Sequence, residues 1–371
     1  MKDLIIDLEN EITKLDNKVT LSNCKLNTNV FLEKNVYFKE LTNFSNAFNG
    51  LFNSSNNSNV LTCYIINNEF LFSKALSYLE GDSLILSEGI KSFNTATLNT
   101  SIAKCSKDFN YYIMRCYEYF IYIYDKSEKR CFMLIKQNKK VLTMINILLL
   151  TPYLMYGELF AVHGGLVNKD DKNVLIKNSS LGGKTTFAIL FASNGWDIIT
   201  EETTYIKNTG EILPYNIRNY FNIRVGTYLN FKEYFNKKNI IIDNFLKMEG
   251  KSSLELFKEG KKGQESIDFS LIGTFKNLES KYISHSFNVS IQENNIFLIN
   301  KCLSNENIDS FLELSLSPTV LLFKELLNYN NIDYNERKKK LKKIFYNTKT
   351  YKINSDFNYK EHFNEILKTI K

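Results

Sequence analysis

The most informative part of the sequence is VLIKNSSLGGKTTFAILFAS at residues 174–193. It begins as a short apolar run, passes through a loop with two adjacent glycines, and continues with apolar residues at Phe187, Leu190 and Phe191. Their i, i+3, i+4 spacing predicts a helix over residues 184–194, and the preceding run predicts a strand. A glycine-containing loop between a strand and a helix is the structural context of a phosphate-binding P-loop.

The loop NSSLGGKT at residues 178–185 carries the residue types that bind nucleotide phosphates. In a P-loop, successive backbone N–H groups and the positive end of the helix hold anionic oxygens. Lys184 is placed to reach the β and γ phosphates, and the hydroxyl of Thr185 is placed to bind Mg²⁺. Asn178 replaces the first glycine of the pattern, and asparagine tolerates left-handed dihedral angles. The alternative interpretation is a glycine-containing loop that leads into an ordinary helix. The predicted cofactor-binding residues are Asn178, Ser179, Ser180, Leu181, Gly182, Gly183, Lys184, Thr185 and Thr186.

Two acidic residues, Glu201 and Glu202, follow the next predicted strand at residues 196–200. In a right-handed β-α-β unit, the end of that strand lies on the same sheet edge as the phosphate loop. A carboxylate there can hold Mg²⁺ or accept the proton of an attacking hydroxyl. Adjacent strand residues point to opposite faces, so the two carboxylates are expected to differ in role unless the strand has already ended. We expect Glu201 to act as the base and Glu202 to join Thr185 at the metal; the alternative is a solvated strand end.

His163 is the histidine whose sequence setting suggests a functional role. His163 lies within LFAVHGGLV at residues 159–167, an apolar run that predicts a single strand. A lone histidine in such a run is more often a hydrogen-bonded core residue. Here the two glycines that follow it lack side chains and allow a ligand or another backbone to approach closely. His285 and His362 have no comparable setting and are interpreted as structural.

Three segments together resemble the catalytic core of the HPr kinase/phosphorylase family: FAVHGGLV at 160–167, VLIKNSSLGGKTT at 174–186 and NGWDIITEE at 194–202. That family has a His-Gly strand, a P-loop of the form GxSGxGKS/T and an Asp-Asp pair, and the spacings match without a gap. The resemblance implies an α/β fold with a phosphoenolpyruvate carboxykinase-like P-loop kinase core. It also implies an ATP- and Mg²⁺-dependent kinase, and it says little of either end of the chain.

The resemblance also implies residue roles, with three departures. Asn178 and Leu181 stand where the family has glycines, and glutamate replaces both aspartates. Each glutamate moves its charge by one methylene, about 1.5 Å. Such a shift can alter metal geometry, so reduced or lost activity stays an alternative. By position, Lys184 and Thr185 would bind phosphate and Mg²⁺, Ser180 would lie on the loop, His163 would border the reaction centre, and Glu201 and Glu202 would replace the aspartates.

The family places an arginine-bearing motif after its acid pair. Arg218 and Arg224 each follow an Asn-Ile dipeptide and could fill that role. An arginine there would offset charge on the transferring phosphoryl group. Loop length does not decide between them, and either could equally be a solvated strand arginine.

The length of 371 residues exceeds a typical single domain, and the apolar fraction of 44% supports a globular protein. Strand-like runs at 60–66 and 111–124, the latter with a hairpin partner at 131–135, predict a β-rich N-terminal domain over 1–138. A buried helix is expected at 141–156, within a P-loop domain over 139–300. Helical patterns at 313–327 and 336–345 predict a helical C-terminal region over 301–371.

Composition narrows the function classes. The net charge of +7 is spread along the chain, so nucleic acid is not expected as a partner. The six cysteines form no CxxC pair, which argues against a zinc site or a disulfide framework. No segment resembles a signal peptide or a membrane span, so cytoplasmic residence is expected. The basic run at 337–343 is interpreted as a solvated helix face, with docking to an anionic partner as the alternative.

The acceptor is the least defined part of the expectation. The family and its relatives phosphorylate proteins and peptides, so a serine or threonine of a peptide or small protein is the expected acceptor. A small-molecule alcohol comes second. A nucleotide-binding regulatory module that has lost phosphoryl transfer is a third alternative, and a homo-oligomer remains open.

Overall fold

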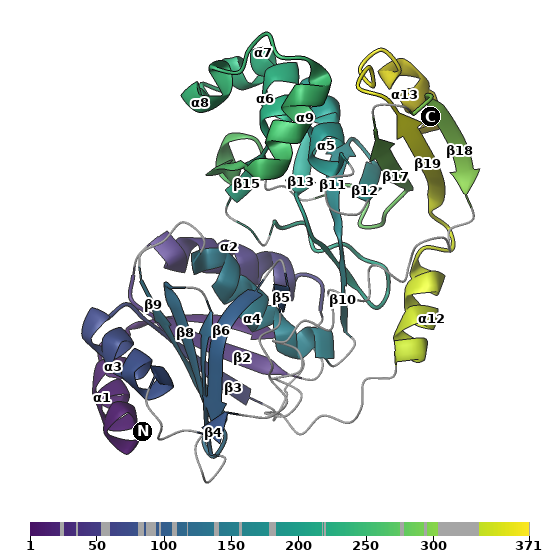
Figure 1. Ribbon diagram of the computed structural model, residues 1–371. Coiled ribbons are helices and arrows are strands. Elements are labelled where there is room, and N and C mark those ends of the chain that lie inside the picture. Colours follow the sequence, from purple (N-terminus) through teal and green to yellow (C-terminus); the bar gives the residue numbers. More distant parts are fainter. Residues whose placement is uncertain are drawn as a thin grey trace. The chain divides into compact units, whose positions relative to one another are not determined.

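The computed structural model describes the chain except residues 23–25, 35, 53–59, 81–84, 87–93, 96–97, 106–109, 117, 137–140, 156–157, 178–182, 217, 219, 275–277, 293–294, 303–333 and 371. The described chain is a mixed α/β protein with several sheets (Figure 1). It divides into two compact units, Met1–Glu158 with Ser315–Ile332 and Leu159–Leu314 with Asp333–Lys371.

The first unit is built on a nine-stranded sheet of order β1-β2-β3-β9-β8-β7-β6-β4, with β5 beside β6. The abundance of β-branched and aromatic residues in these runs favours extended structure. The strands are β1 (Asn17–Ser22), β2 (Asn27–Leu32), β3 (Val60–Ile66), β4 (Ile85–Leu86), β5 (Asn94–Thr95), β6 (Leu98–Cys105), β7 (Tyr111–Cys116), β8 (Phe120–Asp125) and β9 (Arg130–Ile135).

One strand prediction in this sheet is wrong. Residues 111–124 form two strands, because the chain reverses around Glu118 and pairs Cys116 with Phe120 in an antiparallel hairpin. The expected hairpin with residues 131–135 does form, between β8 and β9, with Asp125 opposite Arg130. The strand predicted at residues 60–66 is β3 and is confirmed.

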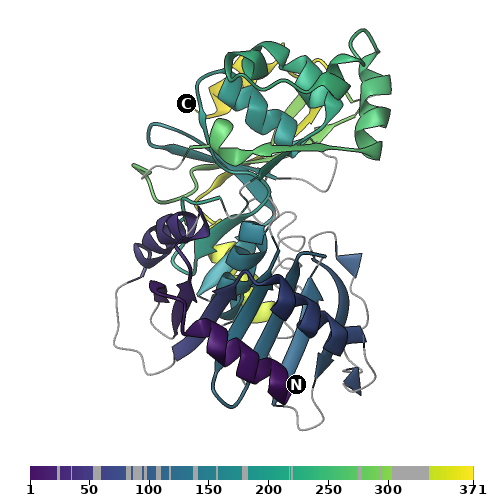
Figure 2. The same cartoon turned by 90° about the vertical axis from the view of Figure 1, so that its left-hand side faces the viewer.

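Helices cover this sheet. Helices α1 (Lys2–Ile12) and α3 (Glu69–Glu80) share one hydrophobic cluster with β7, β8 and β9, and Figure 2 shows α1 lying across that face. Further helices among the described residues of this unit are α2 (Val36–Asn49) and α4 (Val141–Met155). The ring of Tyr153 in α4 packs against Phe48 in α2 at 4.5 Å, and its hydroxyl donates to the carbonyl of Leu21 at 2.8 Å. The buried helix predicted at 141–156 is therefore α4.

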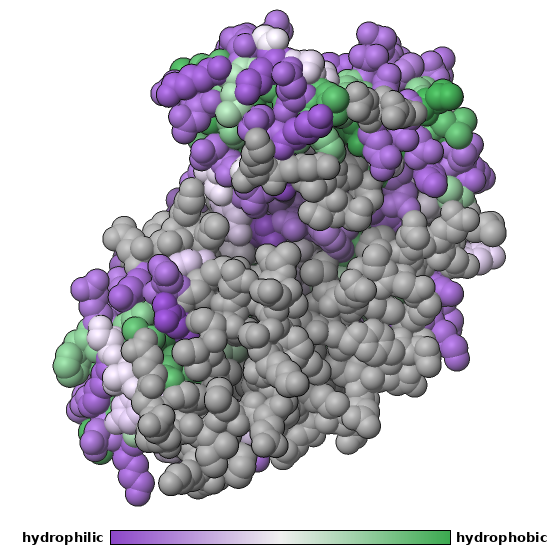
Figure 3. All heavy atoms as spheres, in the orientation of Figure 1, coloured by the Kyte–Doolittle hydropathy of each residue, from purple (hydrophilic) through white to green (hydrophobic). Residues whose placement is uncertain are grey.

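The expected boundary at residues 138 and 139 differs from the observed one. Helix α4 belongs to the first unit, whose N-terminal segment runs to Glu158, because its side chains pack on α2 and β1. No helix within the described ranges is long and apolar enough to span a bilayer. On the face drawn in Figure 3, the described surface of the second unit is mainly hydrophilic, with small hydrophobic patches.

The second unit centres on a six-stranded mixed sheet of order β13-β11-β12-β17-β19-β18. Strands β12, β17 and β19 run parallel, and β11 is antiparallel to both of its neighbours, β12 and β13. Consequently β12 and β13 run in the same direction with β11 between them, and helix α5 connects them. The strands are β11 (Gly164–Lys169), β12 (Lys172–Lys177), β13 (Asp197–Thr200), β17 (His285–Ile291), β18 (Leu298–Cys302) and β19 (Lys349–Ser355), and α5 is Lys184–Ser193.

Two short sheets accompany this one. Strand β10 (Leu159–Val162) pairs with β14 (Thr204–Lys207), and β15 (Tyr220–Ile223) pairs with β16 (Glu265–Asp268). A helical segment lies between β15 and β16 in the sequence. It comprises α6 (Val225–Asn230), α7 (Lys232–Lys237), α8 (Asp243–Leu246) and α9 (Ser253–Lys262), and a short 3₁₀ turn η1 (Phe269–Leu271) follows β16.

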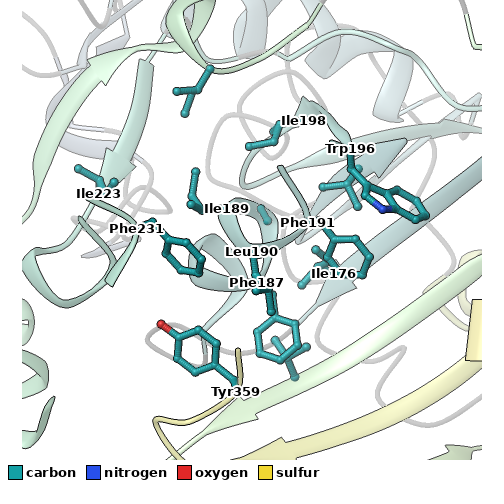
Figure 4. Close-up of a cluster of buried hydrophobic side chains, with 14 of the residues drawn as sticks. Ile176, Phe187, Ile189, Leu190, Phe191, Trp196, Ile198, Ile223, Phe231 and Tyr359 are labelled. Atoms are coloured by element: carbon teal, nitrogen blue, oxygen red, sulfur yellow. The ribbon is translucent and has the colours of Figure 1, made fainter. Parts of the chain in front are cut away.

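The core of the second unit surrounds α5. Phe187, Leu190 and Phe191 are buried together with Ile176 and Trp196, as Figure 4 shows. The predicted apolar positions are therefore core positions, and Ala188 and Ile189 between them are also buried, so α5 is covered on more than one face. Burying an aromatic or aliphatic side chain stabilises a fold by roughly 1.5–3 kcal/mol, so this cluster anchors α5, whose first turn carries Lys184, against the sheet.

The C-terminal region contains a strand where only helices were expected. Strand β19 lies inside the six-stranded sheet, between the two helices α12 (Tyr334–Ile344) and α13 (Phe363–Ile370). The helix predicted at 313–327 lies outside the described residues. In α12, Arg337 is buried and donates to the carbonyl of Leu159, whereas Lys339 and Lys340 are exposed.

Candidate active site at a shared strand bend

The predicted phosphate-binding residues are partly described. Asn178, Ser179, Ser180, Leu181 and Gly182 lie outside the described residues. Gly183 is the N-cap of α5, and Lys184, Thr185 and Thr186 form the first helical turn. The φ of Gly183 is +98°, and a Cβ added there would lie 2.6 Å from the side chain of Ile291. Only glycine satisfies both constraints without strain.

His163 lies at a bend and not inside a continuous strand. The run at residues 159–167 divides into β10 and β11, with His163 between them. The division arises because its two halves pair with different strands: Val162 pairs with Thr204 of β14, and Leu166 pairs with Thr200 of β13. The chain from β13 to β14 bends at Glu201 and Glu202, so the histidine and the acid pair lie opposite one another.

These residues lie at the end of the sheet where β12 stops and the predicted phosphate loop begins in the sequence. Gly164, which directly follows His163, pairs with Lys177 at the end of β12, and residue 178 begins the predicted loop. Thr200, which directly precedes Glu201, is the last residue of β13. The edge predicted from the β-α-β rule therefore carries all of these positions, with antiparallel β11 inserted between the two parallel strands.

Gly165 explains why no side chain separates the two bent strands. A Cβ added to Gly165 would lie 2.6 Å from the carbonyl oxygen of Glu201 and 3.3 Å from that of Thr200. The sequence analysis allowed for a close approach of backbone at this glycine, and the approaching backbone is that of Glu201.

Glu202 is the centre of an ion-pair cluster. Its carboxylate contacts the guanidinium of Arg218, and its Oε1 lies 3.6 Å from Nε2 of His163. Burial opposes ionisation, but the charge of Arg218 and the nearby imidazole of His163 outweigh it and lower the pKa of Glu202 to about 2. The side chains of His163 and Glu202 are 25% and 30% exposed, so this cluster is open to solvent and His163 is not a core residue.

Glu201 faces inward. The hydroxyl of Thr185 donates to its Oε1 at 3.3 Å, and its backbone N–H donates to Oδ1 of Asn216 at 3.0 Å. Its other carboxylate oxygen, Oε2, is buried and has no hydrogen-bond partner among the described residues. Burial, followed by the negative charge of Glu202, raises the pKa of Glu201 to about 7. The two adjacent glutamates therefore differ strongly. Both follow the end of β13 at Thr200, so their different surroundings, and not strand alternation, cause the difference.

Lys184 also lies in this electrostatic cluster. Burial lowers the pKa of Lys184, and the charges of Glu202 and Glu201 oppose that shift. The half-buried ammonium group of Lys184 lies in the first turn of α5, where its attraction to an anion is less screened than in bulk water.

The structure distinguishes the two candidate arginines. Arg218 contacts Glu202 directly, and its side chain is only 11% exposed. Arg224 instead donates from Nη1 to the carbonyl of Gly260 in α9. Burial lowers the pKa of Arg224 and the charge of Glu202 opposes the shift, so it senses the acid pair only at longer range.

Sequence reasoning missed several polar residues around this site. Asn216 is 3% exposed; besides accepting from Glu201, its amide donates to the carbonyl of Arg218. Thr186 hydrogen-bonds to Thr227 of α6 at 2.8 Å. The Asn-Ile-Arg motif was a signal for Asn216, but asparagine is so frequent in this chain that a single one carries little information.

The residues present fit a Mg²⁺ ion that is shared with a nucleotide. Mg²⁺ prefers oxygen ligands and is commonly bound by one or two carboxylates together with substrate phosphates. The hydroxyl of Thr185 and the unpartnered, buried Oε2 of Glu201 supply such oxygens. Within the described ranges, no group of three or more His, Cys, Asp or Glu residues could hold a metal by itself.

No protein-family model matches the chain, and no curated protein sequence matches it either.

Proposed function

We propose that this protein is an ATP- and Mg²⁺-dependent phosphotransferase with a phosphoenolpyruvate carboxykinase-like P-loop kinase core. The observation that carries the proposal is the meeting of three sequence-distant elements at one sheet edge. The first turn of α5 with Lys184, the bend at His163, and the acid pair lie together, and Thr185 and Glu201 are joined at 3.3 Å. A solvated strand end would not bring these groups together.

Phosphoryl transfer depends mainly on positioning and on stabilising charge, because the transferring group is loosely bound to both oxygens in the transition state. Lys184 would bind the β and γ phosphates. Thr185 and Glu201 would hold Mg²⁺, which when bound neutralises charge on the phosphates. The sequence analysis assigned Glu202 to the metal, but the hydroxyl of Thr185 lies beside Glu201, and this supports exchanging the two roles.

Glu202 and His163 would then face the acceptor hydroxyl. Glu202 is 30% exposed, whereas Glu201 is almost fully buried, so only Glu202 is accessible to a large acceptor. Its low pKa makes it a weak base, but a loose transition state needs orientation of the hydroxyl and of its proton more than strong basicity. Arg218, bonded to Glu202, would hold the carboxylate in place and offset negative charge.

The acceptor that we propose is the hydroxyl of a serine or threonine in a peptide or small protein, as the family resemblance implies. A small-molecule alcohol is the other acceptor class. A regulatory module that binds ATP without transferring its phosphoryl group is the competing function, because Asn178 and Leu181 stand where the family has glycines.

Turnover of ATP separates these functions, whereas binding does not. The experiment follows the release or transfer of the γ-phosphoryl group of labelled ATP with Mg²⁺, with and without a library of Ser/Thr peptides. The proposal predicts Mg²⁺-dependent label transfer to peptide, lost in Glu202→Gln. ATP binding without any turnover, in wild type and variant alike, would leave the regulatory function.

A further inference from the structure

The two bent strands stop pairing with each other at the candidate site. The pairing of β10 with β14 ends at Val162 and Thr204, and the pairing of β11 with β13 starts at Leu166 and Thr200, next to a β-bulge. Residues 163–165 and 201–203 lie between the two ladders, and no strand pairing joins these two described segments. A gap in a ladder leaves backbone groups that need other partners.

Two threonine side chains bridge this gap. The N–H of Leu166 donates to Oγ1 of Thr200 at 3.1 Å. The hydroxyls of Thr200 and Thr204 lie 2.7 Å apart, and the hydroxyl of Thr204 donates to the carbonyl of Gly164 at 2.9 Å. Each hydroxyl carries a single hydrogen. Because Thr204 uses its hydrogen for Gly164, Thr200 must donate to Thr204, and the whole chain of hydrogen bonds has one direction.

This hydroxyl bridge, formed by Thr200 and Thr204, lies next to the residues to which the proposed function assigns catalytic roles. Thr200 directly precedes Glu201, and the carbonyl that Thr204 holds belongs to Gly164, which directly follows His163. Both threonines are fully buried, at 0% exposure. Such a chain cannot exchange its partners for water without opening the core, so it fixes the two bends relative to each other.

We propose that Thr200 and Thr204 are positioning residues that hold His163 against Glu202 and keep Glu201 beside Thr185. The inference rests on the proposed function, because it assigns the hydroxyl bridge a role in phosphoryl transfer. Valine has nearly the shape of threonine and suits a buried strand, so packing alone would not require a hydroxyl at either position. The hydroxyl is needed because Leu166 and Gly164 have backbone groups to satisfy.

The test compares Thr204→Val and Thr200→Val with Thr204→Ser and Thr200→Ser. In Thr204→Val we expect the dissociation constant for ATP without Mg²⁺ to stay within about twofold, since Lys184 is untouched. ATP turnover with Mg²⁺ should fall about 10- to 100-fold, the loss typical of a misplacement of about 1 Å. Thr204→Ser should restore turnover. In Thr200→Val, hydrogen exchange of the Leu166 amide should accelerate, whereas Thr200→Ser should keep it slow.

Thr348→Val is the matched control. It also removes a buried threonine hydroxyl that donates to a backbone carbonyl in the same unit, that of Ile283, but at the opposite edge of the sheet. It should leave ATP turnover unchanged. Unchanged turnover in Thr204→Val, or a serine variant no better than valine, would overturn the positioning role. If the wild-type protein binds ATP without turnover, the proposed kinase function is wrong instead. The rate of hydrogen exchange of the Leu166 amide in Thr200→Val would then test the hydroxyl bridge by itself.

Discussion

At the scale of single residues, the acid pair shows how strongly position governs chemistry. Glu201 and Glu202 are identical and adjacent, yet burial and the charge of its neighbour raise the pKa of Glu201 to about 7. Arg218 and His163 overcome burial and lower the pKa of Glu202 to about 2. The inward carboxylate faces Thr185, and the outward one faces solvent.

The first prediction concerns stability against pH. The folded-state pKa of Glu201 lies above its ordinary value, so between about pH 4.5 and about pH 7 the folded state binds more protons than the unfolded state. The contribution of Glu201 to stability therefore falls as pH rises through this window. Glu201→Gln removes this fall, so the stability of the variant relative to wild type should increase from pH 5 to pH 8. Urea unfolding at both pH values measures the free energy of unfolding of each protein. A difference between variant and wild type that does not change with pH would contradict the pKa shift.

The second prediction concerns the phosphate site. A hydrogen bond to a charged group contributes about 1.5–3 kcal/mol, so Lys184→Ala should weaken ATP binding about 10- to 100-fold. Isothermal titration measures the affinity, and circular dichroism should show an intact fold. Lys169→Ala, at the opposite end of β11, is the control and should bind ATP like wild type. Equal affinity of wild type and Lys184→Ala would refute the P-loop assignment.

At the scale of elements, the shared bend in the paired strands brings the residues of the candidate site together. Two antiparallel chain segments run side by side along β10–β11 and β13–β14 and bend together, so side chains from both bends meet. Gly165 permits this contact because any side chain there would meet the carbonyl of Glu201.

The third prediction tests that contact. The added methyl group of Gly165→Ala would lie 2.6 Å from the carbonyl oxygen of Glu201 and must displace it. Overpacking of this kind costs about 1–3 kcal/mol, and ATP turnover should fall more than ATP affinity. Gly263→Ala is the control, because nothing lies within 4 Å of an added Cβ there. If Gly165→Ala and Gly263→Ala turn over ATP at comparable rates, close contact between the two bends is not required for turnover.

The sequence predicted the strands and the helix next to the candidate site better than the strand pairing that brings their residues together. Local sequence patterns located β12, α5 and β13. The two strands are short apolar runs, and the helix has apolar residues at i, i+3 and i+4. The run at 159–167 was predicted as one strand because apolar composition does not reveal that its halves pair with different strands. The hydroxyl bridge was missed for a related reason: Thr200 and Thr204 are ordinary strand residues by type, and only their register brings them to 2.7 Å.

At the scale of the whole molecule, the chain forms two compact units with separate cores. The candidate site lies entirely within the second, and the first has a nine-stranded sheet with its own hydrophobic cluster. The sequence indicated a β-rich N-terminal part, but it placed α4 with the second domain. The packing of Tyr153 on Phe48, which joins α4 to the first unit, is a long-range contact that local patterns do not encode.

The fourth prediction follows from this division. If each unit unfolds with its own core, calorimetry should resolve two transitions. Mg²⁺ and ATP should raise the unfolding temperature of the second unit only. A ligand at 100 times its dissociation constant stabilises the folded state that binds it by about 2.7 kcal/mol. In Lys184→Ala the same transition should lose most of this shift. A nucleotide-induced shift of both transitions together would contradict independent units.

The proposed phosphoryl-transfer centre consists of the bend at His163 and the acid pair, next to the predicted phosphate loop. A crystal structure with a non-hydrolysable ATP analogue and Mg²⁺ would show where the nucleotide binds relative to these residues. We predict phosphates bound by the loop before α5 and by Lys184, Mg²⁺ beside Thr185 and Glu201, and the γ-phosphate facing His163 and Glu202. A nucleotide bound elsewhere, or one whose γ-phosphate lies far from His163, would contradict the proposed centre.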